Sequence, residues 1–127
     1  MRILVTGSRD WPYAQVVYDE LSRIAQEHGN ITVVEGACPT GSDQFAHVWV
    51  KDQQFSGSDT VGERHPADWA KHGKAAGPLR NQEMVDLGAD LCLVFCLNSS
   101  RGTLDCARRA QAAGIRVRWI ELRIVEP

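Results

Sequence analysis

Three short segments rich in Gly, Ser and Thr each follow an apolar run, and their composition suits the binding of phosphate. They are residues 6–9 (TGSR), 36–43 (GACPTGSD) and 99–103 (SSRGT). Glycine lets a ligand approach the backbone, and the N–H groups at a helix start attract anions. One such segment alone is more typical of an ordinary turn, but three at one edge of a sheet favour a phosphate-bearing ligand.

Charged residues near these segments are candidates for contact with that ligand. We expect Arg80 in the first turn of a helix that starts around Pro78, where the helix dipole disfavours a cation unless an anionic ligand compensates. Asp43 could bind a ribose, but a role as helix cap or first-turn acid is the stronger interpretation. The predicted ligand-binding residues are Gly7, Ser8, Arg9, Asp10, Gly36, Gly41, Asp43, Arg80, Asn81, Ser100, Gly102 and Thr103.

Other polar and aromatic residues carry weaker signals. Trp11 and Trp69 lie in predicted loops, where either could stack on a base, although covering the core is the more ordinary use. Loop histidines such as His65 and His72 could transfer protons but are more often surface or packing residues. Further charged candidates are Lys74, Arg101, Glu35 and Asp105. No catalytic residue is assigned from these observations.

The fingerprints for common cofactors and metals do not occur in the chain. It contains neither GxGxxG nor GxxxxGK[ST], and its four cysteines form no CxxC pair and have no close His partner. We therefore interpret the cysteines as free thiols and expect no metal and no cofactor. The four are Cys38, Cys92, Cys96 and Cys106.

The elements that must position these residues alternate between strand and helix. Short apolar runs predict strands at 2–6, 31–34, 91–96 and 115–122, with a candidate strand at 60–64. Amphipathic spacing predicts helices at 13–28, from the Thr40–Asp43 cap to about Gln54, from Pro78 to Gly88, and after 98–103 up to Gly114. Residues 65–77 have no clean period. This order predicts the α/β class: one Rossmann-like domain over 1–127, with a doubly wound, mainly parallel sheet flanked by helices.

Composition limits the partners and the compartment. The 127 residues carry a net charge of −2, so the chain lacks the basic field that would hold duplex nucleic acid. The first apolar stretch is five residues long, too short for a signal-peptide core or a membrane span. We therefore expect a cytoplasmic protein with no membrane partner.

Four ordered segments resemble the YspA/YpsA-related branch of the SLOG superfamily. They are GSRDW at 7–11, EGACPTGSDQFA at 35–46, HPADWAKHGKAAGPLRNQEM at 65–84 and RGTLDCARRAQAAG at 101–114. The resemblance implies a Rossmann-like fold, a nucleotide or nucleotide-derived ligand, and a homodimer or larger homo-oligomer. It also relates the chain to the LOG phosphoribohydrolases, which cleave a base from a nucleotide.

The LOG enzymes carry a PGGxGTxxE segment whose glutamate acts with an upstream arginine. Arg80 resembles that arginine, but the glutamate position falls on Cys106, and Asp105 should point about 100° away on a helix. Phosphate binding through Ser100, Gly102 and Thr103 does not need the glutamate. The first hypothesis is therefore a module that senses or sequesters a nucleotide-derived molecule. The alternatives are an N-ribohydrolase or phosphoribohydrolase with another acid, such as Asp10, Glu35 or Asp43, and a protein-interaction domain.

Overall fold

The chain forms one five-stranded sheet in which every neighbouring pair is parallel. The computed structural model describes residues 1–98 and 100–122. The strands are β1 (Arg2–Gly7), β2 (Thr32–Glu35), β3 (Val61–Arg64), β4 (Leu91–Leu97) and β5 (Val117–Leu122), in the spatial order β3-β2-β1-β4-β5. The chain builds outward from β1 to β3, then returns to β1 and builds the other way. Strand order therefore reverses between β1 and β4, where ligands of open α/β sheets usually bind.

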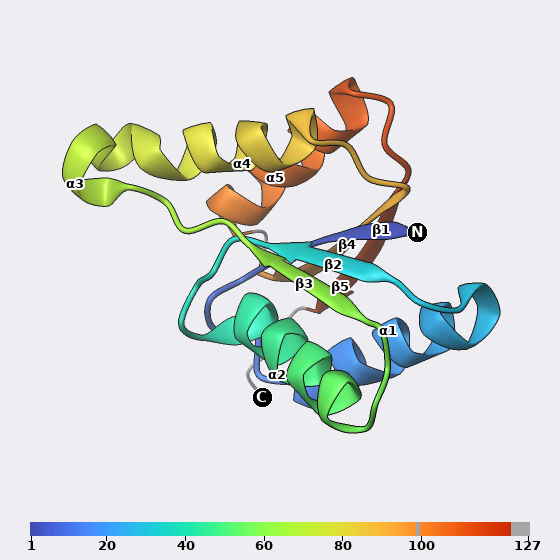
Figure 1. Cartoon of the computed structure of the whole chain (residues 1–127). Coiled ribbons are helices and arrows are strands. Elements are labelled where there is room, and N and C mark those ends of the chain that lie inside the picture. The colour runs from blue at the N-terminus through green and yellow to red at the C-terminus, as the bar shows by residue number, and fades with distance from the viewer. Residues whose placement is uncertain (99, 123–127) are drawn as a thin grey trace.

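Helices cover both faces of the sheet. Figure 1 shows α1 (Ala14–His28) and α2 (Gly41–Phe55) on one face, and α4 (Ala76–Asp86) and α5 (Arg101–Ala112) on the other. The short helix α3 (Trp69–His72) and the 3₁₀ turn η1 (Gly73–Ala75) lead into α4 beyond the carboxyl ends of the strands. The predicted α/β class with a doubly wound parallel sheet is confirmed.

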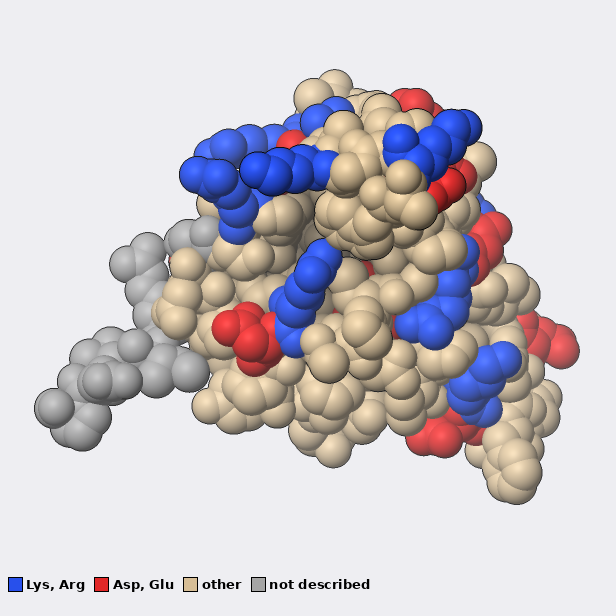
Figure 2. Space-filling view, turned by 90° about the vertical axis from the view of Figure 1, so that its left-hand side faces the viewer, with Lys and Arg blue, Asp and Glu red and all other residues tan. Residues whose placement is uncertain are grey.

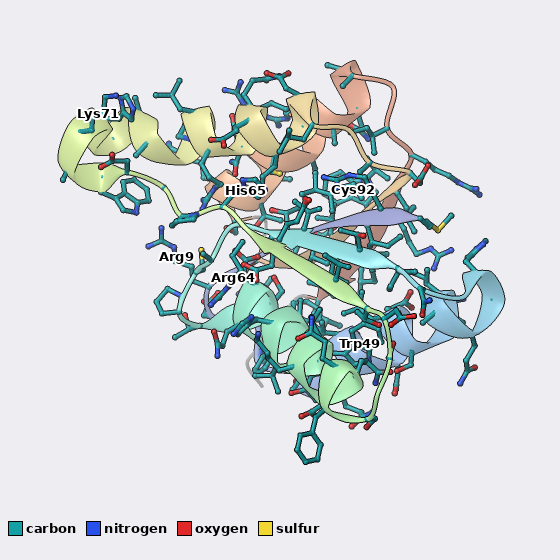
Figure 3. The ribbon with its side chains drawn as sticks, in the orientation of Figure 1. Arg9, Trp49, Arg64, His65, Lys71 and Cys92 are labelled. Carbon is teal, nitrogen blue, oxygen red and sulfur yellow. The ribbon has the colours of Figure 1, made fainter. Side chains whose placement is uncertain are left out.

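Two cores form because alternate residues of each strand face opposite layers. In β4, Leu93 and Phe95 pack toward α1 and α2, whereas Cys92 and Val94 pack toward α4 and α5. The buried side chains of Trp49 and Cys92, labelled in Figure 3, belong to these two cores. This two-sided burial explains why the β4 sequence is a continuous apolar run.

The structure corrects three local predictions. Helix α4 begins at Ala76, because the 3₁₀ turn runs directly into it, so Arg80 lies in the second turn and the first-turn dipole argument does not apply. The hydroxyl of Thr40 makes no cap bond to α2 and donates instead to the carbonyl of Arg9. Residues 65–77, for which the sequence predicts no element, contain α3, η1 and the first two residues of α4.

Within the described residues, no helix is long and apolar enough to cross a membrane.

Candidate ligand-binding site

A cavity of about 940 Å³ opens at the point where strand order reverses, at the carboxyl ends of β1, β2 and β4. Figure 2 views the molecule from this side and shows a hollowed face with Lys and Arg side chains at its borders. All the predicted ligand-binding residues except Ser8 and Gly41 line it: Gly7, Arg9, Asp10, Gly36, Asp43, Arg80, Asn81, Ser100, Gly102 and Thr103. The three turns therefore converge as expected.

Ser8 and Gly41 support the cavity from behind. The Ser8 hydroxyl is buried and accepts a hydrogen bond from the Leu97 N–H at 2.9 Å, which joins the ends of β1 and β4. Gly41 has a φ of +75°, and a Cβ there would overlap the backbone carbonyl of Ser8. Both residues hold backbone segments together rather than face the open space.

The loop after β2 does not offer its N–H groups to a ligand, because two buried carboxylates already accept them. Asp43 Oδ2 accepts hydrogen bonds from the N–H groups of Gly36 (3.2 Å) and Cys38 (3.3 Å), and Glu35 Oε1 accepts one from Ala37. Ala37 has a φ of +59°, which is uncommon for a residue with a Cβ. Of the three predicted phosphate turns, this one presents a carboxylate to the cavity instead of N–H donors.

Burial weakens the acidity of both carboxyl groups. Desolvation raises the pKa of Glu35 to about 7, against the hydrogen bond from Ala37 and the attraction of Arg64, whose Nε lies 2.8 Å from Glu35 Oε2. Desolvation also raises the pKa of Asp43, although hydrogen bonds from Cys38 and Gly36 favour its ionised form. Glu35 is 2% exposed and lies behind the loop, whereas Asp43 lines the cavity. The cavity therefore contains a carboxyl group that retains its proton more readily than usual.

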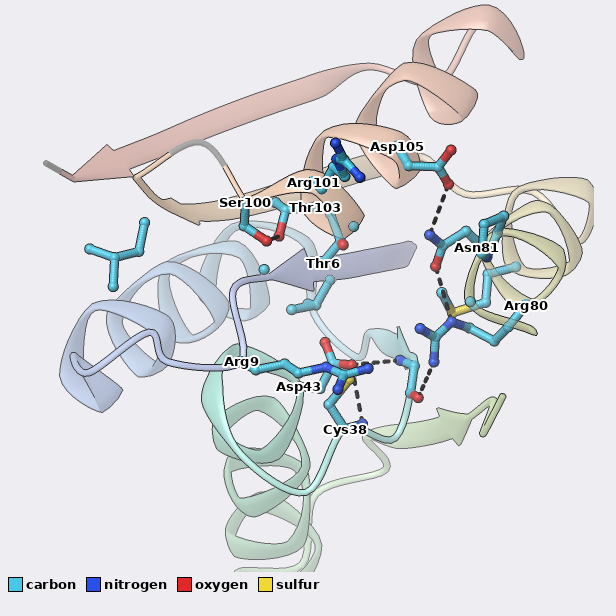
Figure 4. A pocket seen from close by; sticks show the side chains of 18 of the residues that line it. Thr6, Arg9, Cys38, Asp43, Arg80, Asn81, Ser100, Arg101, Thr103 and Asp105 are labelled. Carbon is cyan, nitrogen blue, oxygen red and sulfur yellow. Dashed lines mark hydrogen bonds between the residues drawn. The ribbon is translucent and has the colours of Figure 1, made fainter. Parts of the chain in front are cut away.

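Arg80 brings a positive charge to the cavity wall beside the loop after β2. Its Nη1 donates to the backbone carbonyls of Gly36 and His65, and its Nε donates to Asn81 Oδ1 at 3.0 Å. A Cβ on Gly36 would overlap the Arg80 guanidinium, so a larger residue here would displace that side chain from its present hydrogen bonds. Asn81 in turn donates a hydrogen bond to Asp105 Oδ2 at 3.1 Å and so links Arg80 to Asp105 (Figure 4).

The start of α5 is the part of the wall best suited to an anion. The first hydrogen bond of the helix runs from Leu104 N–H to the Ser100 carbonyl, and the N–H groups of residues 101–103 find no acceptor among the described residues. Apart from its chain neighbours and the backbone of α5 itself, a Cβ built on Gly102 would meet no atom of the described residues within 4 Å. The backbone here is thus open to a close approach from the cavity, beside a positive helix end.

Comparison with known proteins identifies the family of the chain. Residues 1–72 match the family described as YspA, cpYpsA-related SLOG. The chain belongs to this family. It is also similar to the Gene 61 protein of Mycobacterium phage D29, at 44% identity over 117 residues, which cover 91% of this chain and 93% of that protein. The predicted family resemblance is confirmed, and the family match contains the first two of the three turns.

In this SLOG protein, the position of the LOG glutamate does not reach the cavity. Cys106 is completely buried between α5 and the sheet, where desolvation raises the pKa of its thiol to about 11. Asp105, one residue earlier, lines the cavity and accepts hydrogen bonds from Asn81 and from Arg109 Nε at 2.9 Å. The helix therefore supplies a carboxylate one position away from the pattern, held by neighbouring side chains.

The two candidate stacking residues differ in their exposure to the cavity. Trp11 is 1% exposed and packs against Phe95 in the core, with ring centroids 5.5 Å apart. Trp69 is 49% exposed, lines the cavity and carries the Arg9 guanidinium 5.6 Å from its ring centroid. Only Trp69 is placed to contact a ligand. Figure 3 shows Arg9 and His65 on the side of the sheet where the strands end.

Most of the remaining charged and histidine candidates lie outside the cavity wall. Of Lys74, His65, His72 and Arg101, only Arg101 lines the cavity. Sequence reasoning missed Cys38 and Arg108, which also line it. Cys38 lies inside a segment already singled out, and Arg108 follows Arg101 by seven residues, a spacing that returns to the same helix face. That spacing was the available signal.

Proposed function

We propose that this SLOG protein binds a nucleotide or nucleotide-derived small molecule in the cavity, in order to sense or sequester it. The observation that carries the proposal is the open start of α5, where three N–H groups without an acceptor among the described residues border a cavity of about 940 Å³. That volume lies at the upper end of typical small-molecule sites. Membership of the family supports the same ligand class.

The chemistry of the walls suggests how such a ligand lies. The phosphate binds at the start of α5, through the N–H groups near Gly102 and the hydroxyl of Ser100, which accepts a hydrogen bond from the buried Thr103 hydroxyl and can donate its own proton. Arg80 supplies a positive charge nearby, and the half-exposed ring of Trp69 stacks on the base. Asp43, which faces the cavity as an acceptor, binds a donor such as a ribose hydroxyl.

One variant tests the phosphate position with little risk to the fold. Gly102 lies in a helix and its φ is not positive. An added methyl group would meet no atom of the described residues within 4 Å outside its chain neighbours and the helix backbone. Alanine should therefore leave the unliganded protein as stable as before, or raise its free energy of unfolding by about 0.5–1 kcal/mol. The same methyl group would obstruct a phosphate held against the backbone.

The experiment is thermal unfolding of both proteins against nucleoside monophosphates and diphosphates, ADP-ribose, NAD and cyclic nucleotides. A ligand at 100 times its Kd adds about 2.7 kcal/mol and raises the wild-type Tm by several degrees. Gly102→Ala should keep the unliganded Tm and lose most of that shift. A panel that moves neither protein, or a shift unchanged by the variant, contradicts the proposal.

A second function is favoured by one observation. Asp43 is a buried carboxyl group in the cavity wall with a raised pKa, which is the property of a general acid. Under this alternative, the protein is an N-ribohydrolase or phosphoribohydrolase in which Asp43 protonates the departing base. Each nucleotide mixture is therefore assayed for free base. Base release by the wild type that Asp43→Asn abolishes, while nucleotide binding persists, would replace the binding proposal with this one.

A further inference from the structure

Two arginines lie on one face of α5 along the cavity wall. Arg101 and Arg108 are seven residues apart, which is about two helical turns, and both line the cavity. Both side chains are exposed, and neither forms a hydrogen bond or an ion pair within residues 1–98 and 100–122. The basic borders of the hollow in Figure 2 are consistent with this placement.

The acid of this helix makes its direct ion pair with a third arginine. Asp105 is the one acidic residue of α5, and its sequence position allows pairing with Arg101, Arg108 or Arg109. It pairs with Arg109, whose Nε lies 2.9 Å from Asp105 Oδ2, and Arg109 Nη1 donates to Gln82 on α4 at 3.0 Å. Asp105 and Arg109 therefore tie α5 to α4. The charge of Arg108 also helps to lower the pKa of Asp105, but Arg108 forms no direct bond with it and lines the cavity together with Arg101.

The space along α5 also continues past the phosphate position. A second hollow of about 480 Å³ between α4 and α5 shares Asp105 and Arg108 with the main cavity. Long side chains in a helix lean toward its N-terminus, so Arg108 leans toward the first turn of α5. A phosphate bound at that turn would have Arg101 beside it and Arg108 one step further along the wall.

We infer that the ligand carries at least two phosphates, as in a nucleoside diphosphate or a compound with a diphosphate link. This inference rests on the proposed function, since it places the first phosphate at the start of α5. Arg101 contacts that phosphate, and Arg108 contacts the second. A ligand with a single phosphate fills only the first position and leaves Arg108 in water.

Titration calorimetry at constant ionic strength tests this with inorganic phosphate, pyrophosphate, and the mono- and diphosphates of the common nucleosides. The diphosphate of the preferred nucleoside should bind about tenfold more tightly than its monophosphate, because each charged hydrogen-bond pair is worth roughly that factor. Arg108→Ala should remove most of this advantage and change monophosphate affinity less than about twofold. Arg116→Ala removes an equal charge from an exposed residue just before β5 and should change neither affinity.

The outcomes separate the inference from the function beneath it. Monophosphates that bind as tightly as diphosphates, or an unchanged diphosphate affinity in Arg108→Ala, overturn the inference and leave the proposed function standing. Pyrophosphate binding that depends on Arg108, without binding of any nucleotide, supports the two-phosphate wall and refutes the proposed function. A short single-stranded oligonucleotide that binds more tightly than every diphosphate, and depends on Arg108, would assign these arginines to nucleic acid and overturn the inference.

Discussion

Replacing Glu35 by Gln should make the protein more stable at pH 8, although it removes an ion pair with Arg64. Burial raises the pKa of Glu35 to about 7, compared with 4.5 in an unfolded chain. The folded state therefore holds a proton here that the unfolded state releases between these values. Stability from this group is complete below pH 4.5 and is lost as pH rises through about 7. The pKa difference corresponds to about 3 kcal/mol.

Urea unfolding at pH 5, 6, 7 and 8, followed by tryptophan fluorescence, measures this loss. Wild type and Glu35→Gln should have similar free energies of unfolding at pH 5, and the variant should lead by up to about 3 kcal/mol at pH 8. Glu63→Gln is the matched control, because Arg2 lowers the pKa of Glu63 and the control difference should stay constant over this range. A wild type that gains stability over Glu35→Gln as pH rises would show that Arg64 outweighs desolvation, and would refute the reasoning.

Two other perturbations probe the cavity walls. Gly36→Ala should push the Arg80 guanidinium off the Gly36 carbonyl and lower the free energy of unfolding by about 1–3 kcal/mol. Most of this loss should disappear when Arg80 is also replaced by Ala. An equal loss with and without Arg80 would show that the strain lies elsewhere. Trp69→Ala should weaken nucleotide binding, measured by calorimetry, by about 1–3 kcal/mol. Trp119→Ala, at a similarly exposed residue on β5, should leave the affinity unchanged. Equal affinities in the two variants would exclude stacking on Trp69.

The parts of the fold that the sequence predicted are those whose pattern reflects burial directly. The run Leu91–Leu97 is apolar throughout because β4 is covered on both faces, and its strand could be read without other information. Helix α3 has four residues, too few for any period, and its start depends on Asp68 accepting the N–H of Lys71. Such a helix is fixed by local capping and by packing of Trp69 against Gly77, which no spacing rule anticipates.

The candidate site shows the same division. Glycine and hydroxyl residues after each apolar run located the cavity, because parallel strands bring their carboxyl ends to one edge. The sequence could not show whether each turn presents N–H donors or a carboxylate to the cavity, since this depends on which side chain accepts which N–H. Asp43 was predicted as a first-turn acid of α2, and it is one, yet it also accepts two N–H groups of the preceding loop. Because Asp43 accepts these N–H groups, the loop presents a carboxyl group to the cavity and no longer offers N–H donors to an anion.

Two carboxyl groups of the cavity, Asp105 and Asp43, differ in the direction of their pKa shift. This difference bears on the choice between binding and cleavage. Burial raises the pKa of Asp105, but hydrogen bonds from Arg109 and Asn81 outweigh burial and leave the pKa below its ordinary value. Asp105 is therefore ionised and held in place, which suits a structural link and not a proton donor. Asp43 is the cavity carboxyl whose pKa is raised. Proton transfer to a departing base would thus require that base to lie at Asp43, whereas stacking on Trp69 with a ribose hydroxyl at Asp43 gives binding without cleavage.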